Sequence, residues 1–150
     1  MEVVDLYISP GHNFVGHHGK PAGKHPIERV GRIECVAGRG IRNDRYFDCE
    51  PDYKQITFFA EETFEALKDR FGLDGKTTAD LRRNVITRGV DLNSLIGREF
   101  EVQGVRFEGV EESRPCYWMD QALCAGAMDA LQGRGGLRAR ILSSGELSVC

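Results

Sequence analysis

The sequence predicts a mainly β domain with few helices. Roughly eight short stretches combine β-branched or aromatic residues with alternation and are bounded by Gly, Pro, Asn or Asp, as strands are. Few stretches have apolar residues at helical spacing, and strands do not alternate with helices as in a doubly wound sheet. A chain of 150 residues that is 41% hydrophobic fits a single domain over residues 1–150 with a buried core.

The composition argues against several classes of protein. A net charge of −3 provides no general basic field, so we expect no nucleic-acid partner. The stretch MEVVDLYIS carries acids within its apolar run, and no apolar run is long enough to span a bilayer, so we expect no membrane partner. Five cysteines without C-x-x-C spacing argue against a zinc site or disulfide framework and for a reducing cytoplasm.

The first part of the chain is predicted to form two strands separated by a long loop. Val3–Ile8 alternates and is β-branched, and Glu28–Val36 has similar character. The loop, Ser9–His25, is rich in Gly, Pro and His and contains all four histidines: His12, His17, His18 and His25. Such histidines pack on the domain, line a binding cleft or bind a metal, and the residues alone leave these roles open.

A glycine-rich stretch, Ala37–Arg45, follows the second strand. Its glycines permit a tight turn and expose backbone N–H groups that suit an anion. Asp44 and Arg45 are either a buried pair that orders this loop or direct site residues.

The middle of the chain is predicted to contain one helix. Gln55–Phe59 has strand character, and Ala60–Phe71 has apolar residues at helical spacing with acids early and bases late. Gly72 is placed to end this helix, and Thr78 is placed to cap a short turn before Arg82.

A predicted hairpin connects two groups of site candidates. Arg82–Asn84 directly precedes a strand, Val85–Thr87. Phe100–Phe107 alternates on both sides of Gly104, which is typical of a hairpin, and its second strand leads to Arg114–Cys116.

The last part of the chain is predicted to form a helix and a final hairpin. Gln121–Leu131 has helical spacing. Leu137–Ile141 is a strand with Arg138 and Arg140 on one face, where two like charges favour a shared anion. The turn Ser143–Glu146 then leads the chain back.

The chemistry is expected around Arg82, Arg83 and Cys116. Guanidinium groups donate paired hydrogen bonds to phosphate or another planar anion. A thiol beside an arginine is biased towards thiolate, which attacks electrophiles or binds soft metals. These residues predict a site for a phosphorylated cofactor with a sulfur-liganded or sulfur-reactive end. Three other cysteines are interpreted as small buried hydrophobic residues: Cys35, Cys49 and Cys124.

The order of these motifs resembles one family. The pattern R-R-N-V-I-T-R-G-V-D-L-x-x-L-I-G-R-x-F from Arg82 to Phe100, followed by a hairpin and R-P-C, is similar to the core of the MOSC domain. That domain occurs at the C-terminus of molybdenum-cofactor sulfurases, in amidoxime-reducing molybdoenzymes and as small stand-alone bacterial proteins. The similarity continues in Gly40–Arg45 and Gly135–Arg140, although Asn43 stands where the family usually has glycine.

The resemblance implies a closed β-barrel of the MOSC type with short peripheral helices and a site at one rim. It also implies binding of molybdenum cofactor (molybdopterin), with Cys116 as the catalytic metal ligand and with Asn84 and Asp44 orienting the reacting groups. The residues expected to bind the cofactor are Arg45, Arg82, Arg83, Asn84, Arg138, Arg140, His17 and His18.

Three functions follow from the resemblance. One is a molybdenum-dependent reductase of N-hydroxylated or similar small compounds, with electrons from a separate donor. The second is a sulfur carrier with a persulfide on Cys116. The chain is too short to contain the family's pyridoxal-phosphate domain, so the sulfur would come from a separate cysteine desulfurase. The third is a non-catalytic cofactor-binding module, and the sequence leaves open whether the protein is an enzyme.

Overall fold

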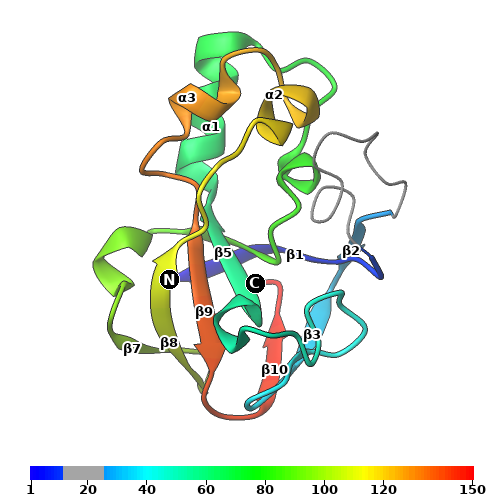
Figure 1. Cartoon of the computed structure of the whole chain (residues 1–150), viewed down its shortest axis with the longest axis vertical. Helices are drawn as coiled ribbons and strands as arrows, with labels where there is room; N and C mark the ends of the chain where they lie inside the picture. The colour runs from blue at the N-terminus through cyan, green and yellow to red at the C-terminus, as the bar shows by residue number, and fades with distance from the viewer. Residues whose placement is uncertain (12–25) are drawn as a thin grey trace.

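Ten strands in the described part of the chain build two sheets (Figure 1). The computed structural model describes residues 1–11 and 26–150. Seven strands form a mixed sheet in the order β2-β1-β6-β5-β9-β8-β7, and three form a second sheet in the order β10-β3-β4. The strands are β1 (Glu2–Ile8), β2 (Glu28–Val30), β3 (Arg32–Val36), β4 (Gly40–Ile41), β5 (Ile56–Ala60), β6 (Val85–Arg88), β7 (Glu99–Val102), β8 (Val105–Glu112), β9 (Leu137–Ile141) and β10 (Gly145–Ser148).

The helices gather at one end of the larger sheet (Figure 1). They are α1 (Glu61–Phe71), α2 (Trp118–Ala122) and α3 (Ala127–Ala130), with 3-10 turns η1 (Asp52–Lys54), η2 (Thr78–Leu81) and η3 (Leu92–Leu95). The prediction of a mainly β chain with few helices is therefore confirmed. Among the described residues, no helix combines the length and the apolar character needed to cross a membrane.

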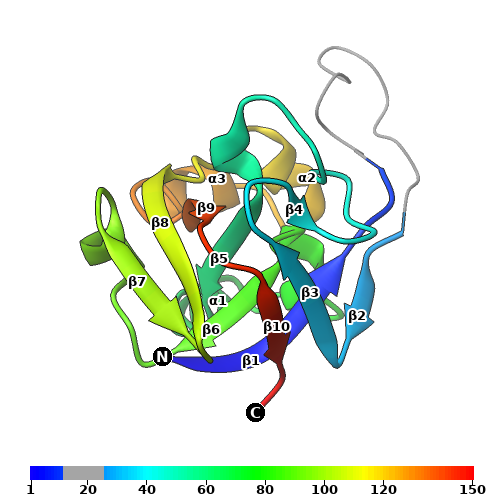
Figure 2. The same cartoon turned by 90° about the horizontal axis from the view of Figure 1, so that it is seen from below.

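Both sheets are open in the described residues, so the expected closed barrel is not supported. The edge strands β2 and β7 do not pair with each other. The smaller sheet packs on the larger one, with β10 against both β1 and β8 (Figure 2). Isolated hydrogen bonds join them, such as Cys150 N–H to the Val3 carbonyl oxygen at 3.0 Å and Gly38 N–H, in the turn between β3 and β4, to the Ile141 carbonyl oxygen of β9 at 3.0 Å. A closed barrel needs a continuous ladder around its circumference, and these bonds do not provide one.

Two long-range pairings differ from the sequence prediction. The single strand expected over Glu28–Val36 is divided at Gly31, because β2 pairs with β1 whereas β3 pairs with β10 and β4. The expected final hairpin is wrong, since β10 leaves β9 and pairs antiparallel with β3, placing Leu147 opposite Ile33. Both errors arise because alternation identifies a strand but does not identify its partner.

The helix predicted over Ala60–Phe71 is confirmed as α1, whereas the single helix predicted over Gln121–Leu131 is wrong. The helix α1 buries Phe64 and Leu67 and ends at Gly72, whose φ of 82° is left-handed and whose N–H donates to the Lys68 carbonyl oxygen at 2.8 Å. The helix expected over 121–131 is instead two short helices, and the second begins after Gly126 at φ 91°. The cap of η2 is Thr77, one residue before the predicted one, in a capping box with Asp80.

The core consists of two clusters, one on each face of the larger sheet. Between the sheets, Phe58 packs edge-on against Phe107 with ring centroids 5.4 Å apart, and Cys35 is fully buried beside Ile33 and Leu147. Burial raises the pKa of Cys35 to about 12. The second cluster joins the sheet to α1, α2 and η2, and this packing fixes the end of the sheet at which the candidate site lies.

Candidate functional site

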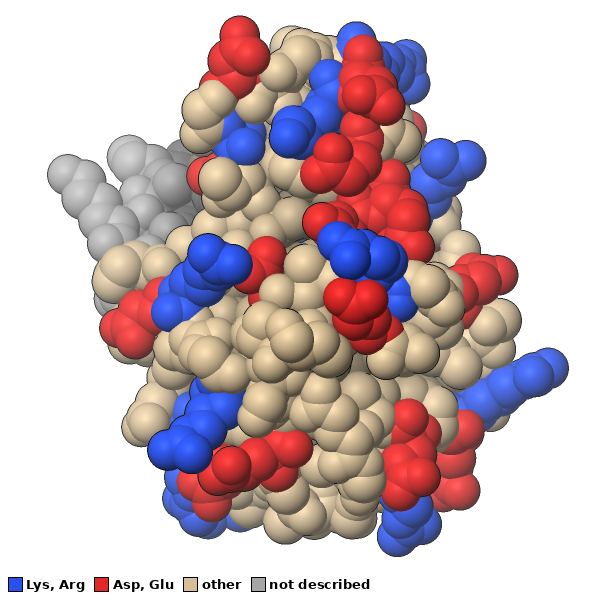
Figure 3. All heavy atoms as spheres, turned by 180° about the vertical axis from the view of Figure 1, so that it is seen from behind, with Lys and Arg blue, Asp and Glu red and all other residues tan. Residues whose placement is uncertain are grey.

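A cavity of about 120 Å³ lies between β5, β9, the residues that precede β6, the end of β8 and α2. Its described lining contains six cationic side chains and no carboxylate. The cations are Arg45, Lys54, Arg82, Arg83, Arg114 and Arg138. Elsewhere the charges are mixed, and Figure 3 shows acidic and basic side chains interspersed on the face opposite the view of Figure 1. The cavity is therefore a local cationic site on a chain with a net negative charge.

Arg83 joins the segments around the cavity through backbone carbonyl groups. Its Nε donates to the Gly135 oxygen at 3.0 Å, Nη1 to the Leu81 oxygen at 3.3 Å and Nη2 to the Ser113 oxygen at 3.1 Å. Burial lowers the pKa of Arg83 to about 10, although nearby Tyr46 acts in the opposite direction. Arg83 therefore stays charged at neutral pH, and it positions the segment that leads to Cys116.

Arg82 is buried and connects the cavity to the end of β1. Its Nη2 donates to the Ser9 hydroxyl oxygen at 2.8 Å and to the Gly11 carbonyl oxygen at 2.9 Å. Its own φ of 55° is left-handed, which closes η2 and turns the chain into β6. Burial, reinforced by the positive charge of Arg45, lowers the pKa of Arg82 to about 10.

Asp44 and Arg45 form a buried pair. One Asp44 oxygen accepts from Arg45 Nη1 at 3.1 Å and from the Ser9 N–H at 3.0 Å, and the other accepts from the Tyr46 N–H at 3.3 Å. Arg45 Nη2 also donates to the Arg82 carbonyl oxygen at 2.9 Å. Asp44 therefore orders the loop and holds Arg45, which lines the cavity, whereas Asp44 itself lies outside the lining.

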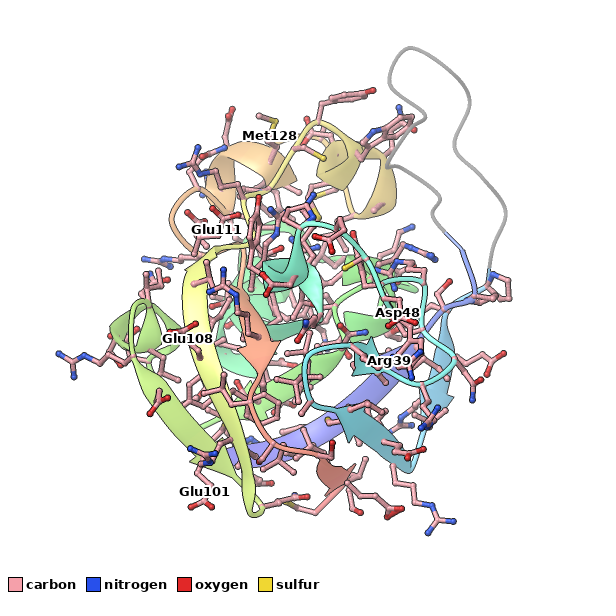
Figure 4. All side chains as sticks on the ribbon, turned by 60° about the horizontal axis from the view of Figure 1, so that its bottom comes forward. Arg39, Asp48, Glu101, Glu108, Glu111 and Met128 are labelled. Atoms are coloured by element: carbon pink, nitrogen blue, oxygen red, sulfur yellow. The ribbon has the colours of Figure 1, made fainter. Side chains whose placement is uncertain are left out.

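A second ion pair closes the same loop at its surface. Arg39 donates to both carboxylate oxygens of Asp48, at 2.7 Å from Nε and 2.6 Å from Nη2, and Figure 4 shows the two side chains facing each other. The Arg39 guanidinium also lies 4.5 Å from the Phe47 ring centroid. This pair supports the backbone that presents Arg45 and Tyr46.

Asn84 lies beneath the cavity and connects three strands. Its side-chain oxygen accepts from the Thr57 N–H at 3.0 Å and from the Thr57 hydroxyl at 3.1 Å, and its side-chain nitrogen donates to the Tyr7 carbonyl oxygen at 3.2 Å. Asn84 is buried and does not line the cavity, but Thr57 does. The structure thus gives Asn84 the function of fixing Thr57 and the sheet.

Arg138 and Arg140 share a face of β9 but have separate anionic partners. Arg138 lines the cavity and pairs with Glu111 at 2.9 Å. Arg140 lies outside the lining and pairs with Asp52 and Glu108, each at 2.8 Å. Figure 4 shows Glu108 and Glu111 on β8, which is adjacent to β9. The two arginines therefore do not share an anion within the described residues.

Cys116 lines the cavity as an exposed thiol. The segment Ser113–Pro115 that leads to it packs closely on Gly135. A Cβ at Gly135 would lie 2.1 Å from the Ser113 carbonyl oxygen, and the neighbouring Ser113 N–H donates to the Gly136 carbonyl oxygen at 2.8 Å. Two glycines and Arg83 together therefore hold the backbone that presents the thiol.

Six lining residues were not assigned to the site from the sequence, although Trp118 was considered as a wall for a flat substrate. They are Tyr46, Lys54, Thr57, Leu81, Ser113 and Met119. Tyr46, Leu81, Ser113 and Met119 are each within three residues of a predicted site residue, whereas Lys54 and Thr57 enter through η1 and β5. Trp118 is buried on the lining, with its ring centroid 4.7 Å from that of Tyr117. Closeness to a sequence motif thus identifies some residues of the cavity wall, whereas Lys54 and Thr57 reach the wall only through the fold of the chain.

Two predicted cofactor-binding residues, His17 and His18, lie outside the described residues. Within residues 1–11 and 26–150, no three His, Cys, Asp or Glu side chains are grouped as a metal site. The described cavity therefore offers one thiol and several cations, instead of a set of protein ligands for a bare metal ion.

Comparison with known proteins identifies the family. The sequence matches the MOSC domain over residues 17–149. The chain belongs to the MOSC domain family. None of the curated proteins matches it significantly.

Solved structures share the fold of this MOSC protein. The YuaD protein of Bacillus subtilis superposes with a TM-score of 0.74 at 20% identity, over 99% of this chain and 91% of YuaD. YiiM of Geobacillus stearothermophilus gives 0.71 at 14% identity, over 98% and 70%. YiiM of Escherichia coli gives 0.60 at 17% identity, over 95% and 65%. At these identities the likeness establishes the fold.

Asn43 stands where MOSC proteins usually have glycine, but the loop backbone keeps a conformation that glycine favours. Asn43 has a φ of 69°, in the left-handed region that glycine adopts without cost. Asparagine is among the side chains that tolerate this region best. The loop before Asp44 therefore turns in spite of the substitution.

Proposed function

We propose that this MOSC protein binds molybdenum cofactor in the cationic cavity and reduces small N-hydroxylated compounds. The observation that carries the proposal is the exposed Cys116 thiol on a cavity lined by six cations and no described carboxylate. MOSC domains are associated with the molybdenum cofactor, an anionic group that brings its own sulfur ligands to the metal.

The residues of the cavity fit this cofactor. Arg45, Arg82 and Arg83 supply fixed positive charge for its phosphate and pterin, because guanidinium donors match phosphate oxygens in pairs. Two of the five N–H groups of the Arg83 guanidinium have no hydrogen-bond partner among the described residues. Cys116 supplies one soft thiolate ligand, which is what a metal with other sulfur ligands requires of the protein.

The proposed reaction removes oxygen from nitrogen. The N–O bond of the substrate breaks, two electrons and two protons are consumed, and the amine or amidine leaves together with water. The bound cofactor supplies two-electron redox chemistry at molybdenum. The electrons come from a separate flavin, haem or iron–sulfur protein in its reduced state. The chain itself binds the cofactor, orients it through Cys116 and the arginines, and holds these groups through Arg83, Asn84 and Asp44.

The exposed thiol also favours a second candidate, a sulfur carrier. Cys116 would attack the outer sulfur of a persulfide on a partner cysteine desulfurase. The S–S bond of the donor would break, the donor would leave as a thiolate, and Cys116 would hold the persulfide without net oxidation. This candidate needs a thiol that is not occupied by a metal.

The deciding experiment is the molybdenum and pterin content of protein purified from a host that makes the cofactor. Cys116→Ala is compared with Cys150→Ala, which removes another exposed thiol. Near-stoichiometric molybdenum in the wild type and in Cys150→Ala, with loss in Cys116→Ala, supports the reductase. Absence of molybdenum together with a persulfide on Cys116, detected by mass spectrometry, supports the carrier. Absence of both overturns both candidates.

A further inference from the structure

The six cations of the cavity differ in how they are held. Arg45, Arg82 and Arg83 each donate to backbone carbonyl oxygens from buried or partly buried positions. Arg138 is partly neutralised by Glu111. Fixed guanidinium groups of this kind suit a resident anion that stays in one orientation.

Lys54 and Arg114 form a second group. Within residues 1–11 and 26–150, neither side chain has an ion pair or a hydrogen bond to a carboxylate. Arg114 is exposed and lies two residues before Cys116, and Lys54 is half-buried at the end of η1. These two cations are therefore available to a group that enters the cavity from solvent.

Among the described residues, several other cations on or near the cavity are neutralised by carboxylates, unlike Lys54 and Arg114. The other basic side chains around the site have carboxylate or carbonyl partners: Arg39 with Asp48, Arg138 with Glu111, and Arg140 with Asp52 and Glu108. Two unneutralised cations beside a thiol raise the local concentration of anions and disfavour cationic substrates.

We infer that the substrate is anionic: an N-hydroxylated compound that carries a carboxylate or phosphate group, bound by Lys54 and Arg114 while its N–O group faces the Cys116 end of the cavity. This inference rests on the proposed reductase function. The anionic group takes no part in the bond changes, since only the N–O bond is reduced. Arg114 offers paired donors and Lys54 a single mobile charge, so either a carboxylate or a phosphate is accommodated.

The first test measures charge preference without any cofactor. Full-length protein from a host that cannot make the cofactor is alkylated with iodoacetate, an anion, or with iodoacetamide, its neutral counterpart. The rate ratio of the two reagents is determined at Cys116 and, as an internal reference, at exposed Cys150. We expect the ratio to be about three- to tenfold higher at Cys116, since each nearby cation favours an anion modestly in a solvated site, and to fall as salt is added.

The variants Lys54→Gln and Arg114→Gln are expected to lower this ratio at Cys116, and the double variant is expected to abolish the excess. Arg106→Gln, which removes an exposed cation of β8 outside the cavity, serves as the matched control and is expected to change nothing. Equal ratios at Cys116 and Cys150, or an unchanged ratio in the double variant, overturn the inference. Failure of Cys116 to react with either reagent overturns it as well, because the binding group must reach this end of the cavity.

The second test uses protein loaded with cofactor and supplied with a reductant. Three aryl amidoximes are compared, one neutral, one bearing a carboxylate and one bearing a phosphate. A lower KM for either charged compound, raised about threefold or more by Lys54→Gln or Arg114→Gln with kcat retained, supports the inference and distinguishes the two anions. Turnover that favours the neutral compound overturns the inference of an anionic substrate but not the proposed reductase function. Failure of the reductase proposal would instead be seen as absence of molybdenum from the purified protein.

Discussion

Arg83 Nη2 donates a 3.1 Å hydrogen bond to the carbonyl oxygen of Ser113, three residues before Cys116. The same guanidinium binds the Gly135 carbonyl oxygen at 3.0 Å, so one side chain joins the two loops that frame the thiol. Arg83 therefore positions the site through backbone groups in addition to contributing charge.

Arg83→Lys is expected to loosen the Ser113–Cys116 segment while keeping the positive charge. A single ammonium group cannot reach carbonyl groups spread around a planar fork, so some oxygens are left without a donor. We expect the free energy of unfolding to fall by about 1–3 kcal/mol. Hydrogen exchange should also become faster at the Ser113 amide, which donates to Gly136. Arg114→Lys is the control, and equal Ser113 protection in both variants would contradict the positioning role.

Gly135→Ala should displace the same segment from the other side. Its Cβ would lie 2.1 Å from the Ser113 carbonyl oxygen and 2.8 Å from Pro115 Cδ, so the backbone must move apart. We expect a loss of about 1–3 kcal/mol in stability, as in other overpacked sites, and lower molybdenum retention. Gly31→Ala is the matched control, since its Cβ meets nothing within 4 Å. Similar thermal midpoints for the two variants would show that the approach of the loops is not needed.

Arg138 and Arg140 offer a paired test of which face of β9 belongs to the site. Arg138→Gln removes a cation from the cavity lining, whereas Arg140→Gln breaks two ion pairs outside it. We expect molybdenum content to fall several-fold for Arg138→Gln and to be unchanged for Arg140→Gln. Pterin released from each purified variant gives an independent measure. Equal losses in both variants would place the cofactor along the whole strand.

Asn84→Ala tests whether Asn84 acts on the sheet or on the cofactor. The substitution leaves the Thr57 N–H and the Tyr7 carbonyl oxygen without partners in a buried setting, which costs about 1–3 kcal/mol for each unsatisfied group. We expect marked destabilisation, measured by urea denaturation, with molybdenum content that recovers when the protein is produced at low temperature. Stability equal to the wild type together with lost molybdenum would instead assign Asn84 to direct cofactor contact.

Cys35 should make stability sensitive to alkaline pH. Burial raises the pKa of the folded thiol to about 12, whereas the unfolded thiol ionises near its ordinary value of about 8.5 to 9. Its contribution to stability is therefore complete below about pH 8.5 and decreases by about 1.4 kcal/mol per unit above pH 9, up to the folded value.

The variant Cys35→Ala isolates this effect. It is expected to be about 1–2 kcal/mol less stable than the wild type near pH 8, because it leaves a small void between the sheets. The difference should shrink when urea denaturation is repeated between about pH 9 and pH 10.5. A difference that stays constant over this interval would show that the Cys35 thiol ionises equally in both states.

The features that were predictable from the sequence depend on neighbouring residues. The helix α1 and its end at Gly72 follow from local spacing, and the hairpin between β7 and β8 follows from Gln103 and Gly104, which take φ values of 51° and 84°. The partner of β10 was not predictable, since β3 and β9 present equally suitable alternation. The position of Asn84 was not predictable either, because its direction depends on whether β6 faces Thr57 or the cavity.

In the candidate site, too, some features were predictable from the sequence and others depend on the fold. The sequence order groups Arg82 with Arg83 and delivers Cys116 after a hairpin, and the fold places these residues with Arg45 and Arg138 on one cavity. Arg140 is the same residue type as Arg138 and lies on the same face of β9. Because it is two residues further along the strand, it pairs with Asp52 and Glu108. Residue type and spacing therefore predict that arginines lie near the site, whereas the ladder register decides which of the two lines the cavity.

The pairing of β10 with β3 has a consequence for biosynthesis. The bond from the Ala37 N–H to the Ser144 hydroxyl joins residues 107 positions apart, beside the ladder that holds β3 between β4 and β10. On the ribosome, β3 emerges early and keeps one edge without a partner until β10 has been synthesised, and such edges promote aggregation. The second sheet and the core beneath it are thus completed only after β10 has emerged, and the edge of β3 is exposed while the intervening residues are made.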